Sequence, residues 1–353
     1  MDESHSQVAV PTPVPVCLSY LRELVILSNG DVTTCCLDKE GQNALGNCRE
    51  KNVLEIWNDD FLPWHERNVI ANIERRKWDT ELCNRCFLGK LNENEGATIS
   101  QDSKEISRFH RISPPFPAWL RIETTSACTY RCWGCVTGSG ELQRSVKLLD
   151  MQLFGKNILP AIKRTRNVRL WHTGEPLLHP NIVEIIAAAR DANPHACIDI
   201  STNGMQINED ICRALIDYEV NYFVIALHGG HRQEGLMRYS RRGPNIETLT
   251  RNIQQVVEFK RAHNATLPWI IVKAILFDWN DSEREMEDFL AYGRALGVDW
   301  IGWDLNVNPH HSSQRVRPGT SAYEDLARRH LLLTEIFRLN LFPAWPGPSP
   351  LAH

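Results

Sequence analysis

The sequence has no long hydrophobic run and no excess of charge of either sign, and these absences exclude whole classes of protein. Its apolar stretches, such as residues 222–227, are far too short to cross a bilayer. Lys and Arg total 39 against 43 Asp and Glu, a formal net charge of -4, which disfavours a broad nucleic-acid-binding face. The N-terminus, MDESHSQVAVPTP, is acidic and interrupted by proline, unlike a signal peptide. We expect a cytoplasmic protein that binds neither membrane nor nucleic acid.

The composition is that of an ordinary globular protein, but its cysteines are clustered. The chain has 353 residues, 42% hydrophobic and 23% charged, so one large domain or two domains are expected. Eleven cysteines would suggest a disulfide framework only in a short secreted chain. Nine of them fall before residue 136, which indicates metal binding. The other two, Cys197 and Cys212, have apolar neighbours and are predicted to be buried core thiols.

Composition divides the chain into five stretches. They are a flexible N-terminus, a segment of short elements, a polar linker, a long α/β region and a Pro-rich tail: 1–16, 17–91, 92–117, 118–342 and 343–353. In the second stretch, Asn29 and Gly30 separate two β-rich runs and predict a hairpin. A helix is expected at about 53–59.

The fourth stretch alternates between apolar, β-branched runs and helical patterns. The six runs are 118–125, 167–172, 196–202, 221–228, 268–276 and 299–306. Continuous apolar strands separated by helices predict a parallel sheet covered by helices. Six such units fit either a partial barrel or a doubly wound sheet, and in both folds the chemistry collects at the carboxyl ends of the strands.

Three cysteines follow the first of these strands. Cys128, Cys132 and Cys135 lie within eight residues, so their thiolates can converge on one iron-sulfur cluster and leave its fourth iron without a protein ligand. Zinc is the chemical alternative, but structural zinc sites normally have four ligands. The spacing therefore favours a cluster that is open to a small molecule.

This arrangement resembles the radical S-adenosylmethionine (radical SAM) enzymes, whose signature is three cysteines at this spacing after the first strand of a partial (β/α)6 barrel. The resemblance covers about residues 115–310. It implies an α/β fold with a partial, TIM-like barrel, a [4Fe-4S] cluster on these cysteines, and SAM as the cofactor. It also implies reductive cleavage of SAM to a 5′-deoxyadenosyl radical, with electrons from a flavodoxin- or ferredoxin-type donor.

The resemblance extends to the ends of the next strands. The turn after the second strand matches a Gly-Gly-Glu-Pro-like turn that holds the methionyl amino group, and the third strand end and a later arginine match positions near the ribose and carboxylate of SAM. The implied SAM contacts are Thr173, Gly174, Glu175, Pro176, Ser201, Asn203 and Arg242. The sequence departs from the family pattern twice. Thr173 replaces the first glycine of the turn, and Gly134 stands before the last cysteine, where the family usually has an aromatic or bulky residue.

A second set of cysteines lies in the N-terminal segment. Cys17 and Cys35 flank the predicted hairpin, and Cys83 and Cys86 form a C-x-x-C pair. Two such pairs can form a site with four ligands, and the residues alone allow either zinc or an iron-sulfur cluster.

The residues around these cysteines resemble the auxiliary-cluster domain called SPASM, or its shorter twitch version. The matching stretches are 25–32, 35–38, 45–47 and 54–58. In related proteins this domain follows the barrel, whereas here it precedes it, and the full seven-cysteine pattern is absent. The resemblance implies one auxiliary [4Fe-4S] cluster bound by Cys17, Cys35, Cys83 and Cys86, although Cys36 could replace Cys35.

These features lead to three hypotheses about function. The first is an enzyme that abstracts hydrogen from a small polar metabolite, such as a sugar, aminocyclitol or nucleoside, in natural-product biosynthesis, with the auxiliary cluster transferring electrons. The second is a maturase that forms a thioether, an epimer or a carbon-carbon crosslink in a peptide. The third is a non-catalytic zinc or iron-sulfur protein. The sequence assigns no catalytic residue, but it predicts a polar lining of the barrel mouth: His172, His228, Lys273, Asp304, Asn306, His310 and His311.

Overall fold

The structure is a computed structural model that describes residues 23–67, 80–84, 116–306, 310–317, 319–329 and 331–332. The two predicted terminal stretches, 1–16 and 343–353, lie outside the described residues. So does the predicted linker, except for its last two residues. The boundaries of the five predicted stretches remain predictions.

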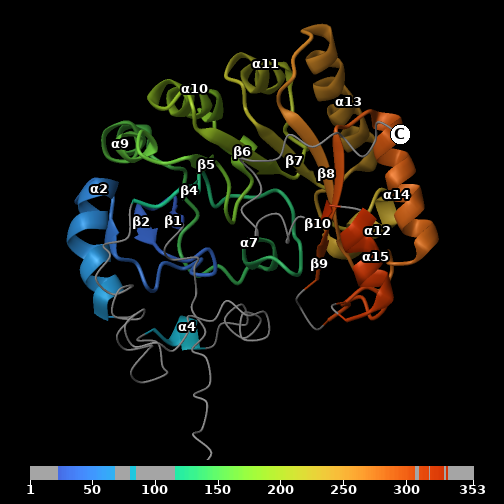
Figure 1. Cartoon of the computed structure of the whole chain (residues 1–353), viewed down its shortest axis with the longest axis horizontal. Coiled ribbons are helices and arrows are strands. Elements are labelled where there is room, and N and C mark those ends of the chain that lie inside the picture. The colour runs from blue at the N-terminus through green and yellow to red at the C-terminus, as the bar shows by residue number, and fades with distance from the viewer. Residues whose placement is uncertain are drawn as a thin grey trace, which may run out of the picture.

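The described residues form one open sheet of ten strands in the order β10-β9-β8-β7-β6-β5-β4-β1-β2-β3. Its centre consists of six parallel strands: β4 (Trp119–Ile122), β5 (Asn167–Arg169), β6 (Cys197–Thr202), β7 (Tyr222–Ala226), β8 (Trp269–Leu276) and β9 (Trp300–Leu305). Each lies within a predicted strand. The sheet curves without closing (Figure 1), so the prediction of an α/β fold with a partial barrel is confirmed.

Helices cover the convex face of this sheet (Figure 1). The main ones are α9 (Leu159–Ile162), α10 (Ile182–Ala192), α11 (Glu209–Asp217), α13 (Ile246–Ala262) and α14 (Glu283–Leu296). Three of them begin at a side chain that accepts a backbone N–H of the first turn: Asn208 for α11, Asn245 for α13 and Ser282 for α14. The core between sheet and helices contains fully buried side chains from alternate strand positions, such as Leu120, Ile198 and Phe223.

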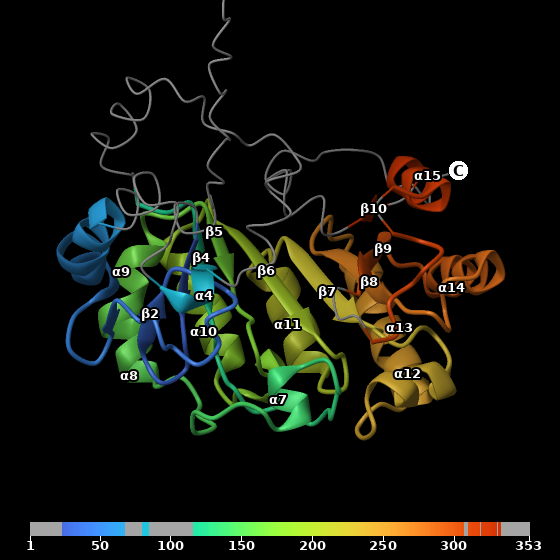
Figure 2. The same ribbon diagram turned by 90° about the horizontal axis from the view of Figure 1, so that it is seen from below.

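The concave face carries the other side chains of the strands. Trp119, Val224, Ile271 and Trp300 form a separate apolar cluster there. Two smaller helices, α7 (Val136–Ser139) and α12 (Gln233–Tyr239), lie together at the end of the molecule that carries the mouth of the barrel (Figure 2). At the opposite end, α15 (Ser321–Arg329) leads to β10 (Leu331–Leu332), which pairs with β9. The sequence did not predict β10, because a two-residue strand leaves no periodic pattern.

The N-terminal segment joins the same sheet. β1 (Glu23–Ile26) pairs in parallel with β4, β2 (Asp31–Thr33) pairs antiparallel with β1, and β3 (Gly46–Asn47) completes the edge. The predicted hairpin at Asn29 and Gly30 is confirmed, and Gly30 has a φ of 96°, which favours glycine. The hairpin predicted as part of a separate segment therefore extends the barrel sheet.

The predicted helix at 53–59 is also present, as α2 (Val53–Glu55) continued by a π-helix, η1 (Ile56–Phe61). Asn52 and Glu55 form a capping box at its start. α4 (Glu81–Asn84) is a further short helix in this half of the chain.

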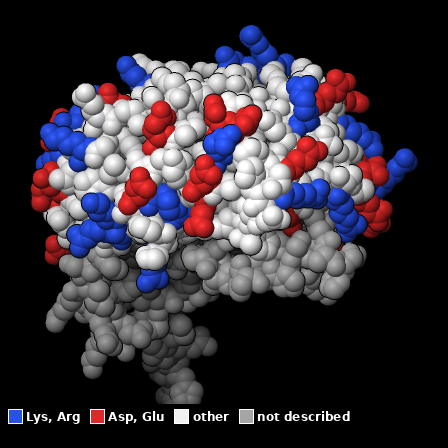
Figure 3. Space-filling view, turned by 90° about the horizontal axis from the view of Figure 1, so that it is seen from above, with Lys and Arg blue, Asp and Glu red and all other residues white. Residues whose placement is uncertain are grey.

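The convex face carries Lys, Arg, Asp and Glu side chains in a mixed pattern, without a large area of one sign (Figure 3). In the described part of the chain, no helix combines the length and apolar character that a bilayer crossing requires. Cys212 is buried, as predicted, whereas Cys197 is only half-buried.

Candidate active site

The three-cysteine loop lies at the carboxyl end of β4 and is fixed by the chain that follows α12. The N–H of Arg131 donates to the carbonyl of Arg242, and the N–H of Arg241 donates to the carbonyl of Arg131, each at 3.2 Å. The N–H of Trp133 donates to the carbonyl of Tyr239 at 3.2 Å. Backbone hydrogen bonds therefore tie the cysteine loop to the end of α12 and to the chain that follows it.

The structure brings Cys128, Cys132 and Cys135 together in one cluster with aromatic side chains. Burial raises the pKa of Cys128 to about 11 and that of Cys132 to about 12, so these thiols need a nearby positive charge, such as that of iron, to ionise. The N–H of Tyr130 points at the sulfur of Cys128 at 3.4 Å and would stabilise a thiolate there. Among the described residues no group of three side chains is placed to hold a single metal ion, whereas a four-iron cluster uses a different iron for each thiolate.

Two glycines allow the backbone to pack closely around this loop. A Cβ on Gly138 would lie 2.5 Å from the backbone nitrogen of Cys132, and a Cβ on Gly174 would lie 2.1 Å from the carbonyl oxygen of Thr125. Both distances exclude any side chain. The turn predicted to bind SAM is therefore in direct backbone contact with the approach to the cysteine loop.

The missing bulky residue at Gly134 is compensated from another element. The ring of Tyr239, at the end of α12, would lie 3.4 Å from a Cβ on Gly134. Trp133 packs against the same tyrosine, with ring centroids 5.5 Å apart and the planes at 71°. An aromatic group thus occupies the space beside the last cysteine, although the loop itself supplies none at position 134.

Glu175 ties the ends of β5 and β6 together. Its carboxylate accepts hydrogen bonds from the N–H of Asn203 at 2.7 Å, from the hydroxyl of Thr202 at 2.6 Å and from the N–H of Leu177 at 3.1 Å. Burial raises the pKa of Glu175 to about 7, against the opposing effect of these bonds. Pro176 begins a 3-10 helix (Pro176–Leu178) directly after it. Both carboxylate oxygens of Glu175 therefore accept hydrogen bonds from the protein itself, and these bonds fix the shape of the turn.

The other predicted SAM contacts lie around the same loop. The amide nitrogen of Asn203 lies 3.9 Å from the sulfur of Cys128, while its oxygen accepts the N–H of Met205 at 3.0 Å. Ser201 is half-buried near the end of β6, and Arg242 is exposed beside the cysteine loop. The roles of these three residues remain predictions.

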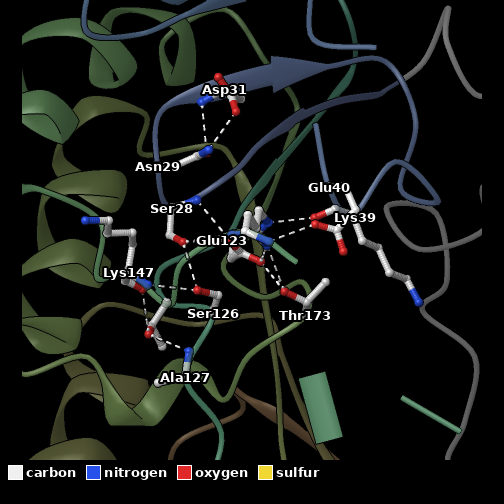
Figure 4. A network of polar contacts seen from close by, with 12 residues as sticks. Ser28, Asn29, Asp31, Lys39, Glu40, Glu123, Ser126, Ala127, Lys147 and Thr173 are labelled. Atoms are coloured by element: carbon white, nitrogen blue, oxygen red, sulfur yellow. Dashed lines mark hydrogen bonds and ion pairs between the residues drawn. The ribbon is translucent and has the colours of Figure 1, made fainter. Parts of the chain in front are cut away.

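The threonine that replaces a glycine belongs to a polar network that the sequence analysis missed (Figure 4). The hydroxyl of Thr173 donates to the carboxylate of Glu123, which also accepts the hydroxyl of Ser28 at 2.7 Å. Arg144 pairs with Glu123 at 2.6 Å and donates to Thr173 at 3.1 Å. The polar residues that follow β4 in the sequence could have indicated Glu123, but no local pattern indicates Arg144.

The opposite side of the barrel mouth carries three of the predicted lining residues. Lys273 on β8 and Asp304 on β9 form an ion pair at 2.8 Å, and both influence the pKa of His228, which follows β7. Burial lowers that pKa to about 3, so the ring is neutral. Its Nδ1 atom is buried and has no hydrogen-bond partner within the described residues. The ring packs edge-on against Tyr239, which links it to the cysteine loop.

His172 resembles His228 in its environment. Its Nε2 atom is buried without a hydrogen-bond partner in the described part of the chain, and burial together with Arg121 lowers its pKa to about 3. It borders a charged layer on the concave face that the sequence analysis also missed. This layer has Arg121 and Glu23 paired at 2.9 Å, and Arg169 and Asp199 at 3.2 Å.

The last three predicted lining residues lie at the edge of the mouth. His311 contacts Asp278 through Nδ1 at 3.0 Å and packs against Trp133. The side chain of Asn306 donates to the carbonyl of His310 at 2.7 Å. They form a rim and do not join the group of His228.

Only part of the predicted auxiliary site is described. Cys35 and Cys36 follow β2 and are half-buried. A hydrogen bond from Cys35 lowers the pKa of Cys36 to about 7, and Arg121 acts in the same direction. Cys83 lies in α4, while Cys17 and Cys86 lie outside the described residues. The ligand set of this site therefore remains a prediction.

An open α/β barrel with three neighbouring thiols at the carboxyl ends of its strands is the arrangement expected of a protein that binds a metal cluster there. Two family models match the chain: the radical SAM superfamily over residues 122–304, and the iron-sulfur cluster-binding SPASM domain over residues 17–87. The first covers more than half of the sequence, so the chain belongs to the radical SAM superfamily. It carries its SPASM domain at the N-terminal side, as predicted. Membership implies a [4Fe-4S] cluster and SAM, and the SPASM domain implies auxiliary iron-sulfur clusters.

Curated relatives match shorter parts of the chain. A GTP 3′,8-cyclase of Mycobacterium marinum is 31% identical over 122 residues, which are 32% of this chain and 32% of that protein. A GTP 3′,8-cyclase of Chlorobaculum tepidum is 34% identical over 94 residues, 26% of this chain and 28% of that protein. The matches span about a third or less of these relatives. The superfamily and these relatives indicate an enzyme, so the hypothesis of a non-catalytic protein was wrong.

Among solved structures, SuiB of Streptococcus suis bound to S-adenosylmethionine is similar with a TM-score of 0.47 and 14% identity. The similarity covers 79% of this chain and 63% of that chain. BtrN in complex with AdoMet and 2-DOIA has a TM-score of 0.30 and 19% identity, and covers 40% of this chain and 62% of that chain.

Proposed function

We propose that this enzyme cleaves SAM reductively to a 5′-deoxyadenosyl radical and uses it to abstract hydrogen from a small polar metabolite, such as a sugar, aminocyclitol or nucleoside. The reaction would take place in the cytoplasm, in natural-product biosynthesis. A flavodoxin- or ferredoxin-type protein would supply electrons, and the auxiliary [4Fe-4S] cluster would transfer them. The single observation that carries the substrate class is the group formed by His228, Lys273 and Asp304.

This group has the properties of a small, nearly neutral binding site. The Lys273–Asp304 ion pair balances its own charge, and His228 is uncharged, so a strongly anionic ligand would gain little from it. The unpaired Nδ1 of His228 can donate or accept one hydrogen bond, depending on its tautomer. Hydroxyl and amino groups of a ligand match these three side chains well.

The floor beneath the group is apolar. Ile271 precedes Lys273 by two residues on β8, so both side chains lie on the same face of the sheet. Ile271 belongs to the concave cluster with Val224, Trp119 and Trp300. Such a floor excludes water from a radical, which would otherwise be lost to side reactions.

The residues of the site would then have separate roles. SAM and its cluster supply, when bound, a radical able to take hydrogen from an unactivated C–H bond. Cys128, Cys132 and Cys135 would hold the cluster, and the Gly174 turn and Asn203 would hold SAM. His228 would orient a substrate hydroxyl through its unpaired Nδ1 atom.

A peptide maturase is the alternative, because one polar side chain of a peptide could occupy the same group. The experiment uses anaerobically reconstituted protein, dithionite and SAM with three kinds of deuterated substrate: an aminocyclitol, a nucleoside and a peptide. The proposal expects deuterium in 5′-deoxyadenosine from a small substrate. Label from the peptide alone would contradict it. His228→Gln should lower the transfer of label about 100-fold, while the exposed His195→Gln serves as the matched control.

A further inference from the structure

Arg144 lies where the N-terminal segment meets the turn predicted to bind SAM. Only 7% of its side chain is exposed, although Gln143 and Ser145 on either side of it are exposed. Burying a guanidinium is costly unless its donors have partners. The partners of Arg144 therefore indicate its role.

These partners come from three separate parts of the chain. On the barrel side, Nη2 donates to Glu123 at 2.6 Å and to Thr173 at 3.1 Å. On the side of the N-terminal segment, Nε donates to the carbonyl of Lys39 at 2.6 Å. The carboxylate of Glu40 accepts the backbone N–H of Arg144 at 3.0 Å. One side chain thus links the segment next to Cys35 and Cys36 with the end of β4 and with the SAM turn.

Glu123 strengthens this link, because it is also bound from both sides. The backbone N–H of Ser28, in the β1–β2 turn, donates to Oε2 at 2.9 Å, while Arg144 and Thr173 contact Oε1. Figure 4 shows Glu123 between Ser28 and Thr173. Its side chain is 0% exposed, so its charge depends on these partners.

Thr173 connects the Arg144–Glu123 pair to the predicted SAM-binding turn. It immediately precedes Gly174, whose backbone packs so closely against the chain before the cysteine loop that a Cβ there would lie 2.1 Å from the carbonyl oxygen of Thr125. The N–H of Glu175 donates to the carbonyl of Ala127, next to Cys128, at 2.7 Å. A shift of Thr173 would therefore change the turn relative to the cluster loop.

We propose, relying on the function proposed above, that Arg144 is a positioning residue that couples the N-terminal segment to SAM binding. Lys39 and Glu40 hold Arg144, and Arg144 with Glu123 holds the Thr173–Gly174 turn in its SAM-binding shape. Coupling between two sites is reciprocal. SAM should therefore also order the N-terminal segment at residues 36–41.

The test avoids removing Arg144 itself, since an unpaired Glu123 could unfold the protein. Thr173→Val removes the hydroxyl but keeps the Arg144–Glu123 pair, and Glu40→Ala removes the carboxylate that accepts the backbone N–H groups of Gln143 and Arg144. Thr173→Ser restores the hydroxyl. Arg213→Gln, an exposed arginine on α11 paired with Glu209, is the matched control.

Three quantities are measured on anaerobically reconstituted protein: iron content, the dissociation constant for SAM, and the EPR spectrum of the reduced cluster with SAM. We expect Thr173→Val to raise the dissociation constant about tenfold and Glu40→Ala a few-fold, with altered spectra and full iron. Arg213→Gln should match the unaltered protein, and Thr173→Ser should recover most of the affinity that Thr173→Val loses. Hydrogen exchange at residues 36–41 should slow when SAM binds to the unaltered protein, and should not slow in Thr173→Val.

Unchanged SAM affinity in Glu40→Ala at full iron would overturn the coupling, because the N-terminal segment would then not influence the turn. Loss of iron in Thr173→Val would also overturn it, since the network would then support the fold rather than SAM. If the unaltered protein with full iron binds no SAM, the proposed function fails, and this inference fails with it.

Discussion

The two sides of the barrel mouth differ in how their polar groups are satisfied. On the side of β4, β5 and β6, the carboxylates of Glu123 and Glu175 are each bound by three or more protein donors. On the side of β7, β8 and β9, the buried Nδ1 of His228 has no hydrogen-bond partner among the described residues, and the Nε2 of His172, which follows β5, is an exception on the first side.

This difference separates two tasks. A cofactor that is the same in every turnover can be held by a rigid backbone whose side chains bind one another, as Glu175 binds Thr202 and Asn203. A substrate needs groups that are free to bind it, and leaving a buried polar group unpaired has a cost that a ligand can remove. We therefore propose that SAM binds beside the satisfied carboxylates and that the substrate contacts His228.

The largest expected effect concerns the cysteine loop. Changing Cys128, Cys132 and Cys135 together to Ala should lower the iron content from about eight to about four per chain and abolish SAM cleavage, because the remaining cluster does not bind SAM. Iron analysis and chromatography of 5′-deoxyadenosine measure both effects. Cys212→Ala, a change at a buried thiol in α11, is the control and should keep all its iron. Unchanged iron in the triple variant would refute the ligand assignment.

The next effect tests the substrate side. His228→Gln should slow product formation about 100-fold, because the substrate is no longer held in the reactive orientation, while SAM is still cleaved without coupling to product. The ratio of product to 5′-deoxyadenosine measures this uncoupling. If both rates fall together, His228 supports the cofactor site and the two sides of the mouth do not differ in function.

A smaller effect tests the cofactor side. Asn203→Ala should weaken SAM binding by about 1 to 3 kcal/mol, the cost of leaving a buried partner unpaired. Iron should remain, because the asparagine lies beside Cys128 without being a ligand. Equilibrium binding together with iron analysis distinguishes the outcomes. Lost iron would make Asn203 a fold residue, and unchanged affinity at full iron would place SAM elsewhere.

The smallest effect is on pH-dependent stability. The pKa of His228 is lowered to about 3 in the folded protein. Its neutral ring therefore adds to the free energy of unfolding at pH values above the pKa that it has in the unfolded chain, and this stabilisation is lost as the pH falls. Between pH 7.5 and 5.5 the unaltered protein should lose about 1 kcal/mol more than His228→Gln. Chemical unfolding at the two pH values measures the difference. Equal losses would mean that the imidazole is accessible to water and protons.

The sequence predicted the parts of this architecture that leave a local pattern. The six strands, the Asn29-Gly30 hairpin and the cysteine loop follow from periodicity, turn residues and spacing, and the structure confirms them. Glu123 and Arg144 were missed because their roles depend on partners far away in the chain, such as Ser28 and Lys39. The same holds for Tyr239, which fills the space beside Gly134 from a different helix.

The continuation of the barrel sheet into the N-terminal segment could not be predicted either. β1 pairs with β4 although about ninety residues separate them in sequence, and no local signal encodes such a pairing. Glu23 on β1 and Arg121 on β4 form a buried ion pair on the concave face, where apolar runs had suggested only hydrophobic contacts.

The most direct test of the central claim measures two quantities on one anaerobically reconstituted sample: iron per chain, and 5′-deoxyadenosine formed from SAM after reduction with dithionite. The account predicts about eight irons and a yield of 5′-deoxyadenosine that exceeds one per chain once a substrate is present. Full iron without any 5′-deoxyadenosine would contradict it. So would stoichiometric zinc in place of iron at the three cysteines.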